Sequence, residues 1–368
     1  MKEINIAKAI VNKRKEKGIT QDDLANYIGV SKASVSKWET GQSYPDITFL
    51  PQLAAYFNIS IDDLIGYEPQ MTKEDIRKLY HKLSVDFINK PFGEVLSHCR
   101  EIVKKYYSCF PLLFQIGALL VNYSTLSGDS EKTVSIITEA KELFIRVKKE
   151  SGDVELATQA LGLEAFCTLT LGNPNEVLEL LGETNAPVYI TETLLASALQ
   201  MTGKIEKAKM VLQVGIYQHI GALFGILPSY LMLCADDMDR FEEICRRTMD
   251  IIETFHIKGL HPSILLNVYL SASQGYLANE KTGKALDMLE KYTEIVTGDI
   301  YPLQLKGDNF FNLLDDWLDE FPLGKAPPRA EKIIKQSMTD AIVNNPAFFA
   351  LTHERRFQSI VERLKNNC

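Results

Sequence analysis

Cysteine is scarce in this sequence, and its spacing excludes the common metal and redox motifs. The chain of 368 residues has 6 cysteines, and no two of them form a CxxC pair. Structural zinc sites use closely spaced Cys and His ligands, which this spacing does not provide. Most of the cysteines fall in apolar helical stretches, where a free thiol behaves as a small hydrophobe. We therefore expect reduced thiols, no metal site and no cofactor.

Long apolar stretches are missing too. No uninterrupted apolar run reaches the roughly 18 residues that a membrane span needs. The first ten residues, MKEINIAKAI, lack the apolar core and the small-residue cleavage site of a signal peptide. These absences favour a cytoplasmic protein without a membrane partner.

Motifs of catalysis are absent as well. The 6 histidines show neither HExxH nor HxH spacing, and no GxSxG nucleophile elbow occurs. The segment VGIYQHIGALFG matches neither the phosphate-binding loop GxxxxGKS/T nor GxGxxG, so close helix packing explains its glycines better than phosphate binding. The chain is not expected to be an enzyme.

Charge is distributed unevenly along the chain. The formal net charge is -8, but residues 1–37 hold eight Lys and Arg against four Asp and Glu. The remaining 331 residues hold 32 basic and 44 acidic side chains. An acidic body repels DNA, so a nucleic-acid partner would have to meet the basic N-terminal part.

Apolar residues recur at helical spacing nearly throughout, and Gly or Pro marks the ends of these segments. A first block ends at IDDLIG, which predicts a domain over residues 1–66 and a linker over 67–71. Thr72 then begins a new helix, with Asp75 three residues later as a partial capping box. Residues 72–368 are expected to form a second, helical unit of about a dozen helices of roughly 10 to 20 residues.

A degenerate repeat is visible in this second unit. Residues 198–213 and 273–292, and more weakly 166–181, each carry a helix with small residues, a Gly- or Asn-marked turn and a second apolar stripe. Small residues let paired helices approach closely, and such pairs need neighbours to bury their apolar faces. These segments resemble tetratricopeptide repeats, although the Trp-Leu-Gly-Tyr start is missing and the spacing exceeds that of the repeat. An irregular helical array is the alternative.

The sharpest pattern predicts two short helices across a three-residue turn. Thr20 can cap the first helix, which Gly29 ends. Ser31 can cap the second, which runs to about Thr40 before Gly41. Two helices so joined make a helix-turn-helix, whose second helix enters the major groove of DNA.

The two faces of that second helix differ in character. Val35 and Trp38 are three residues apart and are expected to point inward, onto Leu24 and Ile28. The outward face carries short or cationic side chains and no acid: Lys32, Ala33, Ser36 and Lys37. Lysine can donate to guanine O6 and N7, and alanine can contact a thymine methyl.

Residues 1–66 resemble the Cro and phage-repressor, or Xre, family of helix-turn-helix domains. The likeness rests on RKEKGITQDDLA, IGVSKASVSKWETG, PDITFLPQLAAYFNI and SIDDLIG. It implies an all-α protein with a five-helix, lambda-repressor-like DNA-binding domain, followed by the tetratricopeptide-like superhelix. It also implies a transcriptional regulator that binds a pseudo-palindromic double-stranded DNA operator as a homodimer.

The resemblance assigns roles to particular residues. Gln21 would contact the DNA backbone, and Ser31 and Thr40 would contact phosphates. The base edges would be met by Lys32, Ala33 and Lys37, with Ser36 on the same face. Arg14 and Glu39 would form a partly buried ion pair between the first helix and the recognition helix. Lys and Ala stand where several phage repressors have glutamine, so their operators do not transfer to this chain.

The function of the second unit is suggested by analogy. Regulators of Gram-positive bacteria that join such a domain to tetratricopeptide-like repeats often bind a short peptide. A peptide or small-molecule effector would meet polar and aromatic residues: Asn122, Tyr123, Tyr217, Gln218, His219, Tyr230, Asn267 and Gln274. The C-terminal segment resembles a closing helix anchored by Arg356 and Phe357, and a basic DNA-binding tail is its alternative. The alternative function is an antitoxin-like or scaffold protein whose helical body binds a partner protein.

Overall fold

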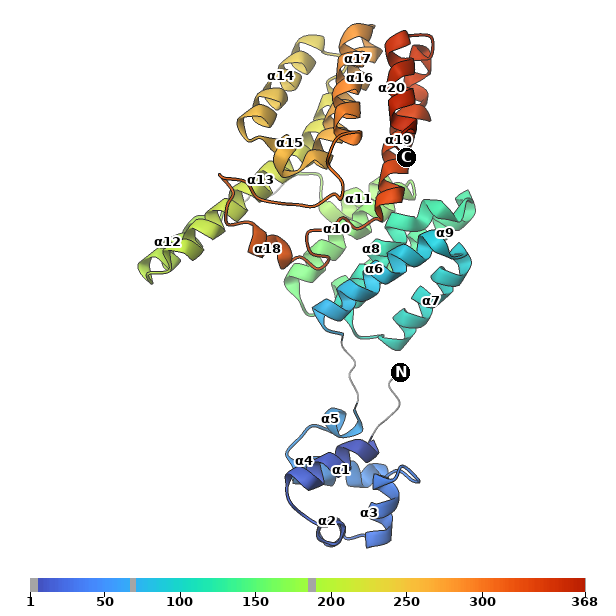
Figure 1. The fold of residues 1–368 in the computed structure, drawn as a ribbon, viewed down its shortest axis with the longest axis vertical. Coiled ribbons are helices and arrows are strands. Elements are labelled where there is room, and N and C mark those ends of the chain that lie inside the picture. The colour runs from blue at the N-terminus through green and yellow to red at the C-terminus, as the bar shows by residue number, and fades with distance from the viewer. Residues whose placement is uncertain (1–5, 67–70, 185–189, 368) are drawn as a thin grey trace.

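Helices joined by turns and one long irregular segment make up the whole described chain (Figure 1). The computed structural model describes residues 6–66, 71–184 and 190–367. No strand occurs among these residues, which confirms the all-α class. Most of the predicted linker, residues 67–70, lies outside the described residues, as does Cys368.

The N-terminal part contains the five predicted helices. They are α1 (Ile6–Glu16), α2 (Gln21–Ile28), α3 (Lys32–Glu39), α4 (Leu50–Phe57) and α5 (Ile61–Ile65), with a 3-10 turn, η1 (Ile47–Phe49), before α4. Their apolar faces meet in one core around Leu24, Val35, Leu53 and Trp38. Every member of this core comes from residues 6–65, so this part has a core of its own.

The first half of the body is a stack of antiparallel helices. It consists of α6 (Lys73–Asn89), α7 (Phe92–Lys105), α8 (Phe110–Tyr123), η2 (Ser124–Ser127), α9 (Ser130–Glu150), α10 (Val154–Thr170) and α11 (Pro174–Leu181). Thr72 caps α6 through the main-chain N–H of Asp75, as predicted. Tyr80, Tyr123 and Phe144 are the large side chains buried at its centre.

The second half contains the remaining helices. They are α12 (Glu192–Met201), α13 (Ile205–Leu233), α14 (Met238–Thr254), α15 (Ile257–Leu260), α16 (Pro262–Ala278), α17 (Thr282–Val296), α18 (Asp315–Asp319), α19 (Glu331–Val343), η3 (Pro346–Leu351) and α20 (Arg355–Lys365). Helix α13 contains Pro228 and is 29 residues long. It is longer than the roughly 10 to 20 residues predicted for the helices of the body. Figure 1 shows α12 and the start of α13 projecting from the body.

The three repeat-like segments fold as pairs of packed helices. These pairs are α10 with α11, α12 with α13, and α16 with α17. Gly172 and Gly203 make the first two turns with φ of 81° and 74°, in the left-handed region that favours glycine. Glu280 takes that conformation in the third turn, with φ of 57°. Paired helices are therefore present, and their kinship with tetratricopeptide repeats stays a prediction.

Two helices have the length and mean hydropathy of a membrane span although no uninterrupted apolar run has that length. Phe110–Ser127 and Ile205–Leu233 are long and apolar enough by length and composition. Polar residues such as Gln115 and Asn122 interrupt the apolar run of the first helix. The first window is 56% buried, as in the core helix of a globular protein, whereas the second is only 17% buried.

A long segment between α17 and α19, which we call the strap (residues 299–330), crosses from one half of the body to the other. The Tyr80 hydroxyl donates to the carbonyl oxygen of Pro328 at 2.9 Å, and the N–H of Ala330 donates to the Tyr123 hydroxyl at 2.9 Å. Arg329 donates to the Asn122 side-chain oxygen at 3.2 Å. The two halves are thus joined by hydrogen bonds as well as by the chain itself.

The C-terminal helix closes the stack. Phe357 on α20 is buried in the core shared with α16 and α17. The Arg356 guanidinium lies 2.7 Å from the Asp287 carboxylate and 2.8 Å from that of Glu290, both on α17. These contacts are those of a capping helix, as predicted, and they leave Arg356 occupied within the protein.

One close helix contact in the second half allows a stability test. A Cβ added to Gly275 on α16 would lie 2.2 Å from a ring carbon of Phe241, which is fully buried. We expect Gly275→Ala to lower the free energy of unfolding by about 1 to 3 kcal/mol because the ring must shift. Gly162→Ala is the control, since nothing lies within 4 Å of that position in α10. Thermal unfolding should show a drop in Tm for the first variant and an unchanged or higher Tm for the second.

Candidate nucleic-acid interface and body cavity

The turn between α2 and α3 is set by local capping. The Thr20 side chain accepts from the N–H of Asp23, whose carboxylate accepts from the N–H of Thr20 in return. Gly29 ends α2 with φ of 83°, and the Ser31 hydroxyl accepts from the N–H of Ser34 to begin α3. Each cap supplies a partner to a helix-end group, so short-range chemistry fixes the angle between the two helices.

The inward and outward faces of α3 lie as predicted from its spacing. Val35 and Trp38 are buried in the core of the N-terminal part. Ser31 at the start of the helix and Thr40 at its end are exposed. The outward residues between them are exposed or half-buried: Lys32, Ala33, Ser36 and Lys37. Lys37 has no ion pair within the described residues. The face is open to a ligand from outside.

An ion pair holds α1 against the end of α3. Arg14 donates from Nε to one carboxylate oxygen of Glu39 at 2.6 Å and from Nη2 to the other at 3.1 Å. Both side chains are largely buried, with 15% and 6% of their surface exposed. Burial alone would raise the pKa of Glu39, but hydrogen bonds from Arg14 and Gln21 outweigh it and lower that pKa. The two residues paired from the sequence are thus brought together.

Two polar residues of α2, Gln21 and Asp22, make contacts with α3 that were not predicted from the sequence. Gln21 donates from Nε2 to Glu39 at 2.8 Å, so it extends the Arg14–Glu39 pair toward the start of α2. The Lys32 ammonium lies 2.6 Å from the Asp22 carboxylate, and both side chains are more than half exposed. Asp22 was missed because ten residues separate it from Lys32, whereas helical i,i+4 pairs are visible in sequence.

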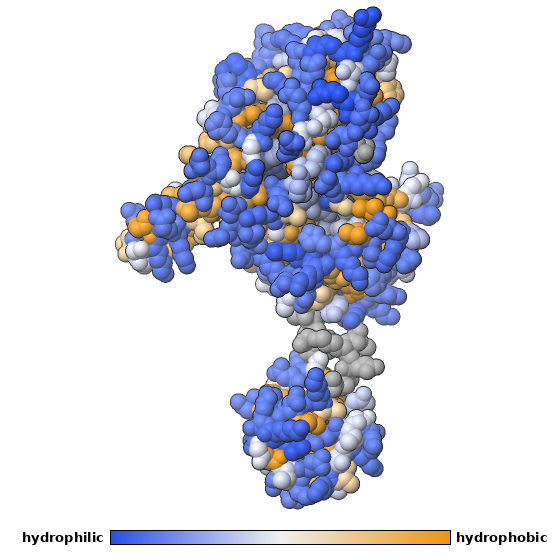
Figure 2. Space-filling view, viewed as in Figure 1, coloured by the Kyte–Doolittle hydropathy of each residue, from blue (hydrophilic) through white to orange (hydrophobic). Residues whose placement is uncertain are grey.

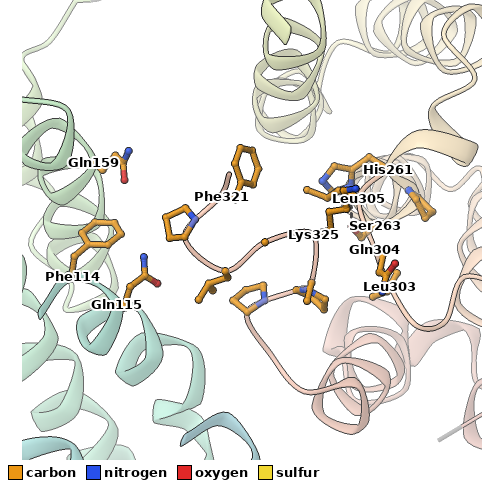
Figure 3. Close-up of a pocket in the computed structure, with 17 residues that line it drawn as sticks. Phe114, Gln115, Gln159, His261, Ser263, Leu303, Gln304, Leu305, Phe321 and Lys325 are labelled. Carbon is orange, nitrogen blue, oxygen red and sulfur yellow. Dashed lines mark hydrogen bonds between the residues drawn. The ribbon is translucent and has the colours of Figure 1, made fainter. Parts of the chain in front are cut away.

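A cavity of about 420 Å³ lies between the two halves of the body, against the strap. Figure 3 shows Phe114, Gln115 and Gln159 on one side, with His261, Ser263 and Gln304 across from them. The strap residues 321–328 lie between these groups. Gln115 is almost fully buried, and burial lowers the pKa of His261, so that imidazole is held neutral near pH 7. The cavity therefore offers neutral amide and hydroxyl groups on a largely apolar lining.

None of the predicted effector residues lines this cavity. Asn122 and Tyr123 bind the strap, and Tyr217 packs edge-on against Phe311 and Trp317. Tyr230 lines a separate groove between α13 and α14. The other predicted residues are exposed or half-buried along α13 and α16: Gln218, His219, Asn267 and Gln274. The structure does not bring the predicted set into one site.

The chemistry of a metal site is not assembled anywhere in the described ranges 6–66, 71–184 and 190–367. No group of three or more His, Cys, Asp or Glu side chains there is placed to hold an ion. The cysteines of these ranges are buried, and burial raises the pKa of the Cys167 and Cys245 thiols to about 11. Such thiols are unreactive at neutral pH.

One solved structure aligns with much of the chain at low similarity. It is the apo form of ComR from S. Thermophilus, with 15% sequence identity over 80% of this chain and 94% of that chain. The TM-score of 0.26 is too low to show a shared fold.

Sequence likeness to known proteins is concentrated in the N-terminal part. The HTH-type transcriptional activator BcrR of Enterococcus faecalis is 32% identical over 74 residues, which is 18% of this chain and 36% of that protein. The cryptic phage CTXphi transcriptional repressor RstR of Vibrio cholerae is 36% identical over 63 residues, or 17% of this chain and 56% of RstR. The chain thus covers less than two thirds of either relative. Residues 10–64 match the family described as Helix-turn-helix, and this part of the chain is a helix-turn-helix domain.

Proposed function

We propose that this chain is a sequence-specific DNA-binding transcriptional regulator that acts as a homodimer in the cytoplasm. Residues 1–66 would bind the operator, and residues 67–71 would link them to the helical body. Residues 72–368 would bind the effector and form the dimer. The observation that carries the proposal is the outward face of α3, with its exposed lysines and no acidic residue. Recognition helices of this type read base edges in the major groove.

The residues around α3 fit defined roles in that complex. Lys32, Ala33 and Lys37 would meet base edges, with Ser36 beside them. Ser31 and Thr40 would contact phosphates at the two ends of the helix. Gln21 would contact the DNA backbone with the part of its amide that Glu39 leaves free, since its Nε2 already donates to that carboxylate.

The cavity beside the strap is our candidate effector site. Its lining combines apolar side chains with the amides of Gln115, Gln159 and Gln304. Amides pair with a peptide backbone, and a lining with a single, already paired charge suits a short apolar peptide or a similar neutral molecule. Lys325 is the charged group of the lining, and Asp315 and Asp319 already neutralise it at 3.2 and 3.1 Å.

The strap gives this cavity a physical route to the DNA-binding domain. Arg77 on α6 donates to the carbonyl oxygens of Asp319 and Phe321 at 2.8 and 2.6 Å, at the edge of the cavity lining. Helix α6 begins at Lys73, directly after the linker to residue 66. A ligand that moves the strap would therefore also move α6, the first helix beyond the DNA-binding domain. Coupling of this kind requires that the ligand bind one arrangement of these elements more tightly than another.

Mapping of bound sites across the host genome tests the regulatory function. Immunoprecipitation of the protein with its DNA should recover a small set of sites that share a pseudo-palindrome. Repeating the mapping with spent culture medium should change the occupancy of those sites if the effector is secreted. Recovery of no enriched sequence under either condition would contradict the proposal.

The cavity assignment predicts a separate result. Gln115→Leu with Gln304→Leu should abolish the rise in Tm that a fractionated spent medium gives to the wild-type chain, because two amide partners of the ligand are lost. Gln218→Leu with Gln274→Leu is the matched control and should keep the full rise, since neither residue lines the cavity. Equal responses of both double variants would remove the cavity from consideration.

A further inference from the structure

Two apolar surfaces of the body are exposed in the part of the chain that the structure describes, residues 6–66, 71–184 and 190–367. The first, which we call the arm face, lies on α12 and the first half of α13. Its exposed members recur at helical spacing and are Leu194, Leu195, Met201, Ile205, Leu212 and Ile216. Leu194 is 71% exposed and Met201 is 89% exposed. Large apolar side chains gathered this densely on an exposed surface mark a binding site for another molecule.

The second surface, the α10–α11 face, lies on the hairpin that precedes the arm in sequence. Phe166 and Leu169 on α10, and Leu178 and Leu181 on α11, are each about half exposed. The inner sides of α10 pack against α8 and α9, so these four residues form the outer side of the first half of the body. On the α10–α11 face the residues of each helix are three positions apart, and on the arm face Leu194 and Met201, and Ile205 and Leu212, are seven apart, which is two helical turns. Such spacing places apolar side chains along one side of a helix, as in helices that pack on other helices.

The charges that border the two surfaces are opposite. Residues 174–184 hold three glutamates and no lysine or arginine, and Glu179 and Glu183 have no ion pair within the described residues. The turn at the tip of the arm holds three lysines and one glutamate, and Lys204 and Lys207 are exposed there without an ion pair in the same ranges. Opposite charges at the rim of an interface favour encounter and set its orientation.

The area also fits an interface between proteins. The arm face exposes six large apolar side chains, and the α10–α11 face adds four. Reciprocal docking would cover both surfaces of each molecule once, so each molecule would contribute its ten exposed apolar side chains, on the order of the 800 Å² that a stable interface buries per partner. Figure 2 shows hydrophobic residues over the projecting arm, with no part of the body covering them in that view.

We propose that the arm face of one copy docks onto the α10–α11 face of a second copy, and the reverse, in a symmetric dimer. Two such contacts related by a two-fold axis form a closed dimer, so neither apolar surface stays exposed to bind a third copy. This deepens the homodimer proposed above by naming its interface. Its test uses no DNA, so failure here would leave DNA recognition by α3 untouched.

Charge and apolar substitutions test the interface in the full chain. Light scattering after gel filtration should give a dimer mass for the wild type. Leu194→Glu and Leu178→Glu should each weaken self-association at least ten-fold, with circular dichroism confirming that both exposed-site variants stay folded. Lys207→Glu should weaken it less, and adding Glu179→Lys should restore it. A monomeric wild type, or a dimer that both glutamate variants leave intact, would overturn the proposal.

Cross-linking separates a second copy from closure within one chain. Met201→Cys and Leu178→Cys are placed in two differently tagged copies, which are mixed and oxidised. We expect a disulfide between the two tags at the mass of a dimer, and none when Met201→Cys is replaced by the control Val85→Cys, which is exposed on α6 and belongs to neither surface. A disulfide formed only at monomer mass, when both cysteines are in one chain, would overturn the proposal. So would binding of the arm to neutral phosphatidylcholine vesicles without any cross-link between copies.

Discussion

Replacing Lys37 by alanine should weaken binding to the operator by about 1 to 3 kcal/mol, which is roughly 5- to 150-fold. Lys37 is exposed on α3, one turn from Ala33 on the same outward face. Its ammonium is not committed to a carboxylate in the described part of the chain, in contrast to Lys32, which pairs with Asp22. Lys37 can therefore donate fully to DNA.

Fluorescence anisotropy with the mapped operator and with a scrambled duplex, at several salt concentrations, measures this effect. A contact to a base lowers affinity for the operator more than for the scrambled duplex, whereas a contact to a phosphate lowers both and reduces the salt slope by about one. Lys78→Ala is the control, because it removes the same charge from α6, where Lys78 pairs with Glu74 at 2.7 Å. Unchanged affinity of the Lys37 variant for both duplexes would contradict the assignment of this face.

The architecture of the DNA-binding domain could be predicted from sequence almost in full. Its helix ends depend on contacts within three residues, such as Thr20 with Asp23 and Ser31 with Ser34. Its core follows from helical spacing, which placed Val35 and Trp38 inward. Local chemistry determines both features, and local chemistry is what a single sequence displays.

The body was predictable in its helices and not in its sites. The strap from residue 299 to 330 has little periodicity, so nothing in the sequence showed that it would cross both halves. The cavity joins Gln115 to Gln304 and Lys325, and only the tertiary fold brings them together. Asn122 was predicted to bind an effector because its side chain is polar, but its oxygen accepts a hydrogen bond from Arg329 at the end of the strap.

Replacing Arg14 by alanine should destabilise the DNA-binding domain by about 2 to 4 kcal/mol. The variant leaves the Glu39 carboxylate in a largely buried position with Gln21 as its remaining side-chain donor. It also removes the hydrogen bond from Arg14 to the carbonyl oxygen of Ile19 at 2.8 Å, which holds the turn before α2. Loss of this domain's stability would in turn reduce DNA binding although every DNA-facing side chain of α3 is kept.

Trp38 reports on this domain selectively. The chain has 2 tryptophans, so Trp317→Phe leaves Trp38 in the core of the N-terminal part as the sole tryptophan fluorophore. Urea titration of fluorescence in that background should show an earlier transition for Arg14→Ala. Arg100→Ala is the control, since its guanidinium pairs with Glu139 at 2.8 Å on the surface of the body and such pairs contribute little. If the Trp38 fluorescence of the Trp317→Phe background, Arg14→Ala and Arg100→Ala changes at the same urea concentration, the Arg14–Glu39 pair does not stabilise the domain.

Lowering the pH should narrow the difference in the free energy of unfolding between the wild type and Arg14→Ala. In the wild type the pKa of Glu39 lies below its ordinary value of 4.5, so the pair stabilises the domain fully above that value and loses its contribution as pH falls through the folded-state pKa. In Arg14→Ala the burial of Glu39 acts without its main partner, so its pKa should rise and protonation should relieve the buried charge. The wild type therefore loses stability on acidification while the variant recovers part of its own. A difference that stays constant from pH 7 to about pH 4 would mean that Arg14 acts through packing and its bond to Ile19.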